Sequence, residues 1–510
     1  MRRVSTCLPQ TSQVFTVTRA SFQHSKRWKL SWFFVAVAVV CLFFADIKIT
    51  TYDPWTELWR FFSGLFKLST VGLDDLGFAV LQTVAFALLG VSLGSVCGLL
   101  LALVFHWRWV RVLCAMLRSV HELFWALIFL QFFGLHPLTG LLALAIPYTA
   151  TFAKIYAEIL EEGDLTAVQV LARGTDNIST FFYARLPDLY QHFKTYTAYR
   201  MECGLRSSAV LGFVGLPTLG YSLSTSFMEG QYGQVWVLLI LFYVLIATMR
   251  IWLRPRLLPV SLVASVFIVN NDTELSLSNV SRFFTQDIVP APLRNGESWA
   301  SVFTWLSDLL VTQALPGLYH TLLLSQIALV ASAVCTLVFF PLVSKQFFTA
   351  FPRGVGHVFL VVLRSTPEYL MAFILLLLWG PSMLPAIVAL ALHNGAIIGH
   401  LVGRYSNELV IRQDASRGLN RYHYEVVPRV YGQMMAFLFY RWEVIVRETA
   451  ILGILGVATL GFYIDSAIQE IRFDRAIVLI AVTALLNLGI DMLSRRLRRW
   501  FRLSSDLTIG

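Results

Sequence analysis

The sequence has few charged residues and lacks the motifs of several common enzyme classes. Charged side chains make up 14% of its 510 residues, against about 25% in an average soluble protein. It contains no Gly-Lys dipeptide, and therefore no phosphate-binding loop of the form Gly-x4-Gly-Lys-Ser/Thr. It also contains no His-Glu-x-x-His motif and no Cys-x-x-Cys pair. We therefore expect no catalytic residues, no metal site and no ATP cradle in this chain, and a membrane enzyme is disfavoured.

Cysteine spacing argues against a disulfide-bonded or cysteine-ligated metal protein, and the distribution of charge argues against a nucleic-acid-binding protein. The six cysteines show no paired spacing, and Cys41, Cys97 and Cys335 lie deep in apolar runs, so we interpret them as small core residues rather than disulfides or metal ligands. The formal charge of +10 comes from 40 basic and 30 acidic residues. No basic soluble domain accompanies it, so nucleic acid is not an expected partner. We attribute the excess to loops on the cytoplasmic face of a membrane.

Long apolar runs make up most of what remains. Apolar residues account for 57% of the chain, and many continuous runs have the roughly 18 to 25 residues that cross a bilayer as a helix. The apolar runs are continuous and do not alternate with polar residues. We therefore expect helices rather than a β-barrel to satisfy the backbone hydrogen bonds in the membrane. The sequence predicts an all-α integral membrane protein with about 12 transmembrane helices. They are expected near residues 30–45, 76–105, 112–133, 138–159, 190–214, 235–252, 258–269, 318–343, 355–379, 384–402, 430–454 and 476–493, with short amphipathic segments near 53–62 and 299–310.

Charge placement predicts the orientation. If the basic N-terminal segment is cytoplasmic, twelve spans return the arginine-rich C-terminal tail to the same side, as the positive-inside rule requires. Six spans per half then give both halves one orientation, so they would be parallel repeats about an axis along the membrane normal. We place the repeats at residues 1–256 and 257–510, called the first and second half from here on.

One stretch occurs twice and indicates a duplication. Residues 200–220 and 441–461 are identical at ten of 21 aligned positions, where about one or two would match by chance. The shared residues include three charges, Arg200/Arg441, Glu202/Glu443 and Arg206/Arg447, and three glycines, Gly212/Gly453, Gly215/Gly456 and Gly220/Gly461. Further matches join Leu117-Arg-Ser-Val-His-Glu122 to Leu363-Arg-Ser-Thr-Pro-Glu368, Gln82-Thr83 to His320-Thr321, and Gly134 to Gly380.

The duplicated charges lie within the fifth span of each half, where charges are costly and usually face a bundle interior or cavity. Glu202 and Arg206 are four residues apart, as are Glu443 and Arg447, so each pair can neutralise itself on one helix face. In that case Arg200 and Arg441 remain to line a central path that favours a phosphorus oxyanion. The alternative is a purely structural set of charges.

Other polar residues in the spans receive structural interpretations. Arg118/Glu122 and Arg364/Glu368 are interpreted as structural pairs. The glycines predict close helix contact or a bent turn, with a gate as the less favoured alternative. His393 and His400 are expected to be hydrogen-bonded core residues.

One long polar segment precedes the fifth span in each half. It covers residues 161–188 in the first half and residues 404–429 in the second. The first holds Gly174, Leu186 and Pro187; the second holds Gly418 and Pro428. Each pattern is compatible with helix, turn, helix, which would project below the membrane, or with an ordinary connecting loop.

The spacing Gly174…Leu186-Pro187 resembles the coupling-loop pattern of ATP-binding-cassette importer permeases. The runs from Leu117, from Leu142 and from Arg441 resemble more narrowly the phosphonate-importer permease family, here as two fused copies. The second pattern departs from the first, because the gap from Gly418 to Pro428 is three residues shorter. The two loops are therefore expected to dock unequally.

The resemblance implies a type I importer fold in a bacterial inner membrane with cytoplasmic termini. It also implies two separate ATPase subunits, which would hold the ATP and magnesium, and a periplasmic solute-binding protein. The cargo would be phosphonate or a related small phosphorus oxyanion. The alternatives are an importer permease for another small solute and an ion-coupled secondary transporter, which also fits twelve spans in two parallel halves.

Overall fold

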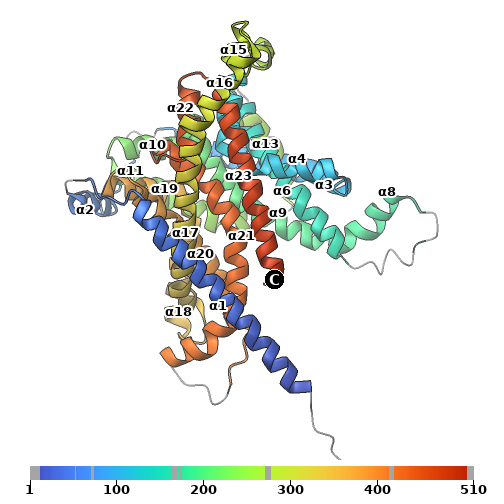
Figure 1. The fold of residues 1–510 in the computed structure, drawn as a ribbon, viewed down its shortest axis with the longest axis vertical. Helices are drawn as coiled ribbons and strands as arrows, with labels where there is room; N and C mark the ends of the chain where they lie inside the picture. Colours follow the sequence, from blue (N-terminus) through green and yellow to red (C-terminus); the bar gives the residue numbers. More distant parts are fainter. Residues whose placement is uncertain are drawn as a thin grey trace, which may run out of the picture.

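The computed structural model describes residues 12–51, 53–70, 74–163, 171, 175–254, 256–269, 277–412 and 418–501. All regular secondary structure in these ranges is helical (Figure 1), which confirms the predicted all-α class. The helices of the first half are α1 (Ser12–Phe44), α2 (Pro54–Gly64), α3 (Leu76–Leu103), α4 (Arg108–Ser119), α5 (Glu122–Phe133), α6 (Pro137–Glu162), α8 (Asn177–Thr180), the π-helix η1 (Phe181–Arg185), α9 (Leu186–Val210), the 3-10 helix η2 (Leu211–Val214), α10 (Leu219–Met228), α11 (Tyr232–Ala247) and α12 (Met249–Trp252).

The second half begins at α13 and repeats much of this order. Its helices are α13 (Leu258–Val269), α14 (Leu277–Arg282), the π-helix η3 (Phe283–Asp287), α15 (Ala291–Arg294), α16 (Trp299–Leu309), the π-helix η4 (Leu310–Ala314), α17 (Leu315–Val343), α18 (Ala350–Ser365), α19 (Glu368–Trp379), α20 (Met383–Ser406), the π-helix η5 (Arg421–Val426), α21 (Val427–Ile454), α22 (Leu460–Gln469) and α23 (Phe473–Trp500).

Five to seven candidate membrane spans follow from length and apolar composition within the described residues. Five helical segments qualify alone: Leu76–Leu103, Pro137–Glu162, Trp299–Val343, Met383–Ser406 and Phe473–Trp500. Two bent helix pairs, α4 with α5 and α18 with α19, raise the number to seven if each pair is one span. Shorter apolar helices cover Trp28–Phe44, Tyr232–Ala247 and Leu258–Val269. The chain is a multi-pass membrane protein.

The expected spans at 112–133 and 355–379 are not continuous helices, so that prediction was wrong in detail. The axes of α4 and α5 differ by 89°, and those of α18 and α19 by 91°. Val120 and Thr366, at the breaks, leave the helical region with ψ of 131° and 121°. Pro367 disfavours a helical conformation at Thr366, whereas the His121 side chain accepts a hydrogen bond from the Leu123 amide and caps α5.

Of the two expected amphipathic segments, the first is confirmed and the second differs from expectation. The first is the separate helix α2, capped by Asp53, whose carboxylate accepts hydrogen bonds from the backbone and side chain of Thr56. These bonds lower the pKa of Asp53. The second is not separate, because α16 continues through η4 into α17 as one helix of 45 residues.

The first helix of each half packs against the other half. Helix α1 packs on α17, and α13 packs on α3; Figure 1 shows α1 running along the second-half helices. Gln326 donates a hydrogen bond of 3.2 Å to the carbonyl of Phe34 in α1. Gln82 donates one of 3.0 Å to the carbonyl of Ile268 in α13. The two halves are thus joined by a reciprocal exchange of helices.

Glycines bring α3 against α6 and α17 against α20. A Cβ at Gly90 would lie 2.7 Å from the Leu144 side chain, and one at Gly403 would lie 2.2 Å from Val343. Residues 90–94 also read Gly-Val-Ser-Leu-Gly, the pattern of a hydrolase nucleophile turn. Here that pattern lies inside α3, with Gly94 packed on Tyr148. It is a helix contact and not a strand-to-helix turn.

Candidate functional site

The duplicated glycines form a tight helical hairpin in each half. A Cβ at Gly220 would lie 1.7 Å from the Ala209 carbonyl oxygen, and one at Gly461 would lie 1.9 Å from that of Ala450. The turns are made by Gly215 and Gly456, with φ of +93° and +88°, where a side chain would be strained. The expectation of close contact and a bent turn is confirmed.

Each hairpin is anchored to the opening of a long apolar helix. The amide of Leu219 donates to the hydroxyl of Thr83 at 2.9 Å, and that of Leu460 donates to Thr321 at 3.0 Å. The short returning helices α10 and α22, which these amides begin, were not expected from the sequence. The threonines are those of the matched pairs Gln82-Thr83 and His320-Thr321.

The third duplicated charge of each half crosses to the other half. Arg206 in α9 donates a hydrogen bond of 3.0 Å to the backbone carbonyl of Arg364, and Arg447 in α21 donates one of 2.9 Å to that of Arg118. Both carbonyls belong to the last turns of the helices that end at the breaks, α18 and α4. Such carbonyls lack helical partners and carry partial negative charge, so the two arginines satisfy them.

The interpretation that Glu443 and Arg447 neutralise each other is wrong. Glu443 pairs instead with Arg118 of the first half at 3.2 Å. The same guanidinium pairs with Asp491 of α23 at 2.7 Å, and Asp491 also pairs with Arg495. Arg118 is therefore a bridge between the halves. No ion pair within 4.0 Å joins Glu202 to Arg206, both of which are described residues.

Arg200 and Arg441 occupy different environments despite their matched positions. The Nε of Arg200 donates to the hydroxyl of Tyr196 at 2.7 Å, and its guanidinium lies 5.3 Å and 5.8 Å from the ring centres of Tyr196 and Tyr199. Arg441 donates to Asn394 at 2.7 Å and pairs with Glu448 at 3.1 Å. Arg200 is thus held by aromatic rings and Arg441 by a carboxylate.

Three carboxylates gather near the helix breaks. Glu122 and Glu368 begin α5 and α19, where the helix dipole favours negative charge. Glu122 accepts a hydrogen bond of 2.7 Å from Ser207. Glu448, at the position of Ser207 in the repeat, is buried and also accepts 2.9 Å from Asn394.

Glu368, His393 and Glu448 form a group with metal-ligand chemistry. One ligand atom from each lies within 4.8 Å of the others, and imidazole with carboxylates suits several divalent metals. His393 is buried and its Nδ1 bonds to the Thr366 carbonyl at 3.0 Å, which confirms the expectation of a hydrogen-bonded core histidine. Because Arg441 already neutralises Glu448, a divalent cation would have to compete with that guanidinium.

The polar segments before α9 and α21 are partly described, and Gly174 lies outside the described residues. Leu186 and Pro187 begin α9 directly after η1, and Pro428 begins α21 directly after η5. Gly418 has φ of +68° and turns the chain before η5. Large apolar side chains are exposed on both segments: Phe182, Tyr183, Val410, Leu419 and Tyr424.

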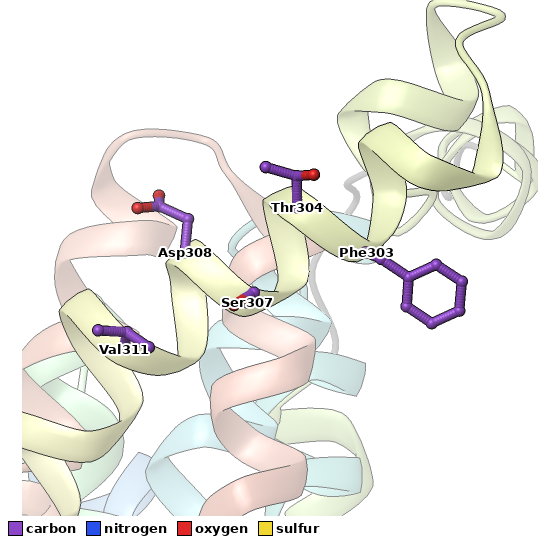
Figure 2. Close-up of a pocket in the computed structure, with 5 residues that line it drawn as sticks. All are labelled: Phe303, Thr304, Ser307, Asp308 and Val311. Atoms are coloured by element: carbon purple, nitrogen blue, oxygen red, sulfur yellow. The ribbon is translucent and has the colours of Figure 1, made fainter.

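The two segments attach to the membrane helices differently. Tyr422 in η5 donates to the Leu337 carbonyl at 3.0 Å and stacks on Phe340 of α17, whereas α8 lies far from the packed helices in Figure 1. A shallow pocket lies elsewhere, along α16 (Figure 2), lined by Phe303, Thr304, Ser307, Asp308 and Val311. Because a single helix supplies this whole lining, it is a surface hollow and not a path.

Sequence reasoning missed Glu448, Asn394 and Asp491. None of the three has an identical counterpart in the first half, so comparison of the repeats passed over them. The available signal was a carboxylate or amide within an otherwise apolar run, which by itself indicates a functional or paired group.

The fold and the site define a helical multi-pass membrane protein whose halves meet at a buried ionic centre. No protein-family model matches the chain, and no solved structure matches it.

Named relatives show which permeases the chain is similar to. The phosphate-import permease protein PhnE of Mycolicibacterium smegmatis is 24% identical over 465 residues, which cover 84% of this chain and 86% of that protein. The putative phosphite transport system permease protein HtxE of Stutzerimonas stutzeri is 33% identical over 28% of this chain and 55% of its own length. The putative cryptic phosphonate transport system permease protein PhnE2 of Escherichia coli is 29% identical over 21% of this chain and 88% of its own length. The resemblance to phosphonate-importer permeases is confirmed.

Proposed function

We propose that this chain is the transmembrane permease subunit of an ATP-driven importer for phosphonate or a related small phosphorus oxyanion. The observation that carries the proposal is the similarity to PhnE of Mycolicibacterium smegmatis along 84% of the chain. Its cargo class rests on relatives whose names refer to phosphate, phosphite and phosphonate. The chain itself performs no covalent chemistry in this proposal and needs no cofactor.

The proposed architecture is two parallel repeats of six spans, at 1–256 and 257–510, with both termini in the cytoplasm of a bacterial inner membrane. The matching helix orders, the two bent pairs and the two glycine hairpins support it. So does the reciprocal bonding of Arg206 and Arg447, because a two-fold relation between the halves would make each contact twice.

Coupling to the ATPases is proposed at the segments 161–188 and 404–429, through Gly174, Leu186, Pro187, Gly418 and Pro428. Two separate ATPase subunits would bind there and hold ATP and magnesium, and a periplasmic binding protein would deliver the solute. The exposed Tyr183 and Tyr424, at 83% and 80% of their full surface, support docking of a partner. Closure of the ATPases would push on these segments and move α9 and α21.

The translocation path is proposed to lie between α9 and α21, near Arg200, Glu202, Arg206, Arg441, Glu443 and Arg447. Of the six, Arg200 is the best candidate to meet an anion, because no carboxylate pairs with it among the described residues and its partners are neutral phenols. Arg441 would first have to leave Glu448. Guanidinium groups match the oxygens of phosphonate geometrically.

An uptake experiment tests the proposal. The chain is expressed with its proposed ATPase and binding-protein partners, in a strain without phosphonate, phosphite or phosphate uptake. Growth is then measured with phosphonate, phosphite or phosphate as the only phosphorus source. We expect growth on at least one of them, lost when the ATPase is inactivated. Growth on none, with all three proteins present in the membrane fraction, would contradict the proposal.

An ion-coupled secondary transporter remains a second candidate because of Glu368 and Glu448, whose carboxylates lie within 4.8 Å of each other and of His393. Buried acidic residues of this kind serve ion coupling in transporters. Uptake that survives ATPase inactivation but is abolished by a protonophore would favour this candidate over the importer.

A further inference from the structure

A second charged group lies between α18 and α20, on the other side of the α18–α19 break from Glu368. It consists of His357 and Arg364 on α18 and His400 and Arg404 on α20. The imidazole rings of His357 and His400 are 5.1 Å apart, and both arginines act electrostatically on both rings. The two helices pack beside them through Leu360 and Ala396, which are fully buried. Four basic side chains therefore converge on one seam.

This basic seam has unsatisfied hydrogen-bonding capacity. His400 is only 6% exposed, and its Nδ1 has no hydrogen-bond partner among the described residues. The Nε of Arg364 is likewise buried without a partner there. This differs from the expectation that His400, like His393, is a hydrogen-bonded core residue. Buried polar groups are normally paired, so an unpaired imidazole beside two guanidinium groups points to a missing acceptor.

No acidic side chain of the described residues forms an ion pair with these four groups. Glu408 lies four residues beyond Arg404 on the chain, but it is not within 4.0 Å of that guanidinium. The exposed side of the seam, where His357 and Arg404 lie, is open to an external group. An incoming anion would meet the two exposed groups first and the buried His400 and Arg364 after them.

The first half provides an internal comparison. The alignment of Leu117 with Leu363 places Arg111 at His357 and Arg118 at Arg364. It also places Lys154 at His400 and Glu158 at Arg404. There two of the three positive charges, Arg118 and Lys154, are paired with carboxylates of the protein. Lys154 pairs with Glu158 at 3.9 Å, and Arg118 pairs with Glu443 and Asp491. The same place in the fold thus contains two paired basic groups in the first half, whereas none of the four basic groups in the second half is paired with a carboxylate of the described residues.

We propose that the seam of His357, Arg364, His400 and Arg404 binds a phosphate oxyanion, and that its source is the headgroup of an anionic phospholipid. Phosphate oxygens accept several charge-assisted hydrogen bonds from arginine and histidine. Phe351, Val355 and Val358 are exposed on α18, next to His357 in sequence, and supply an apolar surface for acyl chains. Basic pockets between membrane helices bind such headgroups. This inference goes beyond the proposed function and does not depend on the transported solute.

The test measures thermal unfolding of the full chain in nanodiscs of phosphatidylcholine. Phosphatidylglycerol is titrated into one series, and inorganic phosphate into another. We expect phosphatidylglycerol to raise the unfolding midpoint of the wild type. Its apparent affinity should be about tenfold weaker in Arg404→Glu, which introduces the acid found at Glu158 in the first half. Arg404→Lys should keep most of the effect, and Lys154→Gln should keep all of it.

The possible outcomes distinguish two questions: whether the seam binds a phosphate oxyanion, and whether that oxyanion comes from a lipid headgroup or from free phosphate. If inorganic phosphate alone reproduces the shift in the wild type but not in Arg404→Glu, the oxyanion site stands and its source is the free ion. If Arg404→Glu responds to phosphatidylglycerol as the wild type does, or if neither titrant shifts the wild type, the proposal is wrong. Because unfolding is measured without transport, these results do not depend on whether the importer function is correct.

Discussion

The guanidinium of Arg447 donates a hydrogen bond of 2.9 Å to the backbone carbonyl of Arg118, in the other half of the chain. The side chain of that same Arg118 pairs with Glu443, one turn before Arg447 on α21. A single residue at the end of α4 is therefore held through both its backbone and its side chain by one helix of the second half. The opposite contact, from Arg206 to Arg364, uses the backbone alone. These two reciprocal contacts are therefore unequal, because an ion pair reinforces the hydrogen bond at Arg118 and not at Arg364.

Asp491→Asn is expected to destabilise the contact between the halves. The Asp491 side chain is only 4% exposed and pairs with Arg118 and Arg495, so the change leaves buried positive charge uncompensated, at about 3 kcal/mol. The measurement is the unfolding midpoint of the chain in detergent. Glu470→Gln on the exposed end of α22 is the control and should leave the midpoint unchanged. Equal midpoints for the two variants would argue against the bridge.

Gly220→Ala and Gly461→Ala should each prevent normal folding, because the new Cβ would lie within 2 Å of a backbone carbonyl. The matched control is Gly77→Ala in α3, where the added Cβ would have no atom within 4 Å. Size-exclusion profiles of a fluorescent fusion should show loss of the monodisperse peak in the first two variants only. A normal peak for Gly461→Ala would mean that the hairpin is looser than the structure indicates.

Substituting Arg441 alone, and then together with Glu448, distinguishes a structural role of Arg441 from a role in transport. Arg441→Gln leaves the Glu448 carboxylate buried with Asn394 as its remaining hydrogen-bond partner among the described residues, so stability should fall by about 3 kcal/mol. Arg441→Gln combined with Glu448→Gln should recover most of that loss. If Arg441 meets the solute in the path, oxyanion uptake stays impaired in the double variant at equal expression. Full uptake in the double variant would remove Arg441 from the path.

Tyr183→Ala and Tyr424→Ala should weaken binding of the ATPase with little effect on folding, because both rings are exposed. The effect should be unequal. Tyr424 extends from η5, which is fixed to α17 through Tyr422, whereas no comparable contact to the membrane helices is described for Tyr183. Co-purification of the ATPase with each variant measures this. Tyr221→Ala, an exposed tyrosine on α10, is the control, and equal loss in all three variants would indicate a non-specific effect.

The membrane orientation predicts which substituted cysteines react from each side. In a chain without its native cysteines, Trp55→Cys on α2 and Phe303→Cys on α16 should react with an impermeant maleimide added outside intact cells. Val410→Cys should react only after the cells are opened. All three side chains are exposed, so accessibility depends on the side of the membrane. Labelling of Val410→Cys in intact cells would contradict the twelve-span orientation.

The sequence predicted the long apolar helices well, because helix α3 or α20 is specified by a continuous run that has no other way to satisfy its backbone in lipid. It did not predict the bends at Val120 and Thr366. Both positions lie in short polar sequences, Arg118-Ser-Val-His-Glu122 and Arg364-Ser-Thr-Pro-Glu368, between longer apolar stretches. The break depends on local features there, a capping histidine in one half and a proline in the other. A hydrophobicity average taken over the length of a whole membrane span does not resolve so short a polar corner.

The candidate site was predicted less well than the fold. The repeat correctly singles out the duplicated charges, yet their spacing points to partners four residues away on the same helix. The partners actually used by Arg206 and Arg447 are carbonyls more than 150 residues away in sequence. Spacing rules describe neighbours on one helix. They do not predict contacts that depend on how the two halves pack against each other. Residues that differ between the repeats, such as Glu448 and Ser207, are invisible to a search for identities.

The joining of both halves in one polypeptide has a consequence for how the molecule divides its tasks. An assembly of two identical subunits must build every contact twice, including any that serves only one purpose. This chain carries an aspartate at 491 on one flank and an arginine at the aligned position 250 on the other. A buried ion pair like that of Arg118 with Asp491 can therefore stabilise one flank without having to be copied on the other.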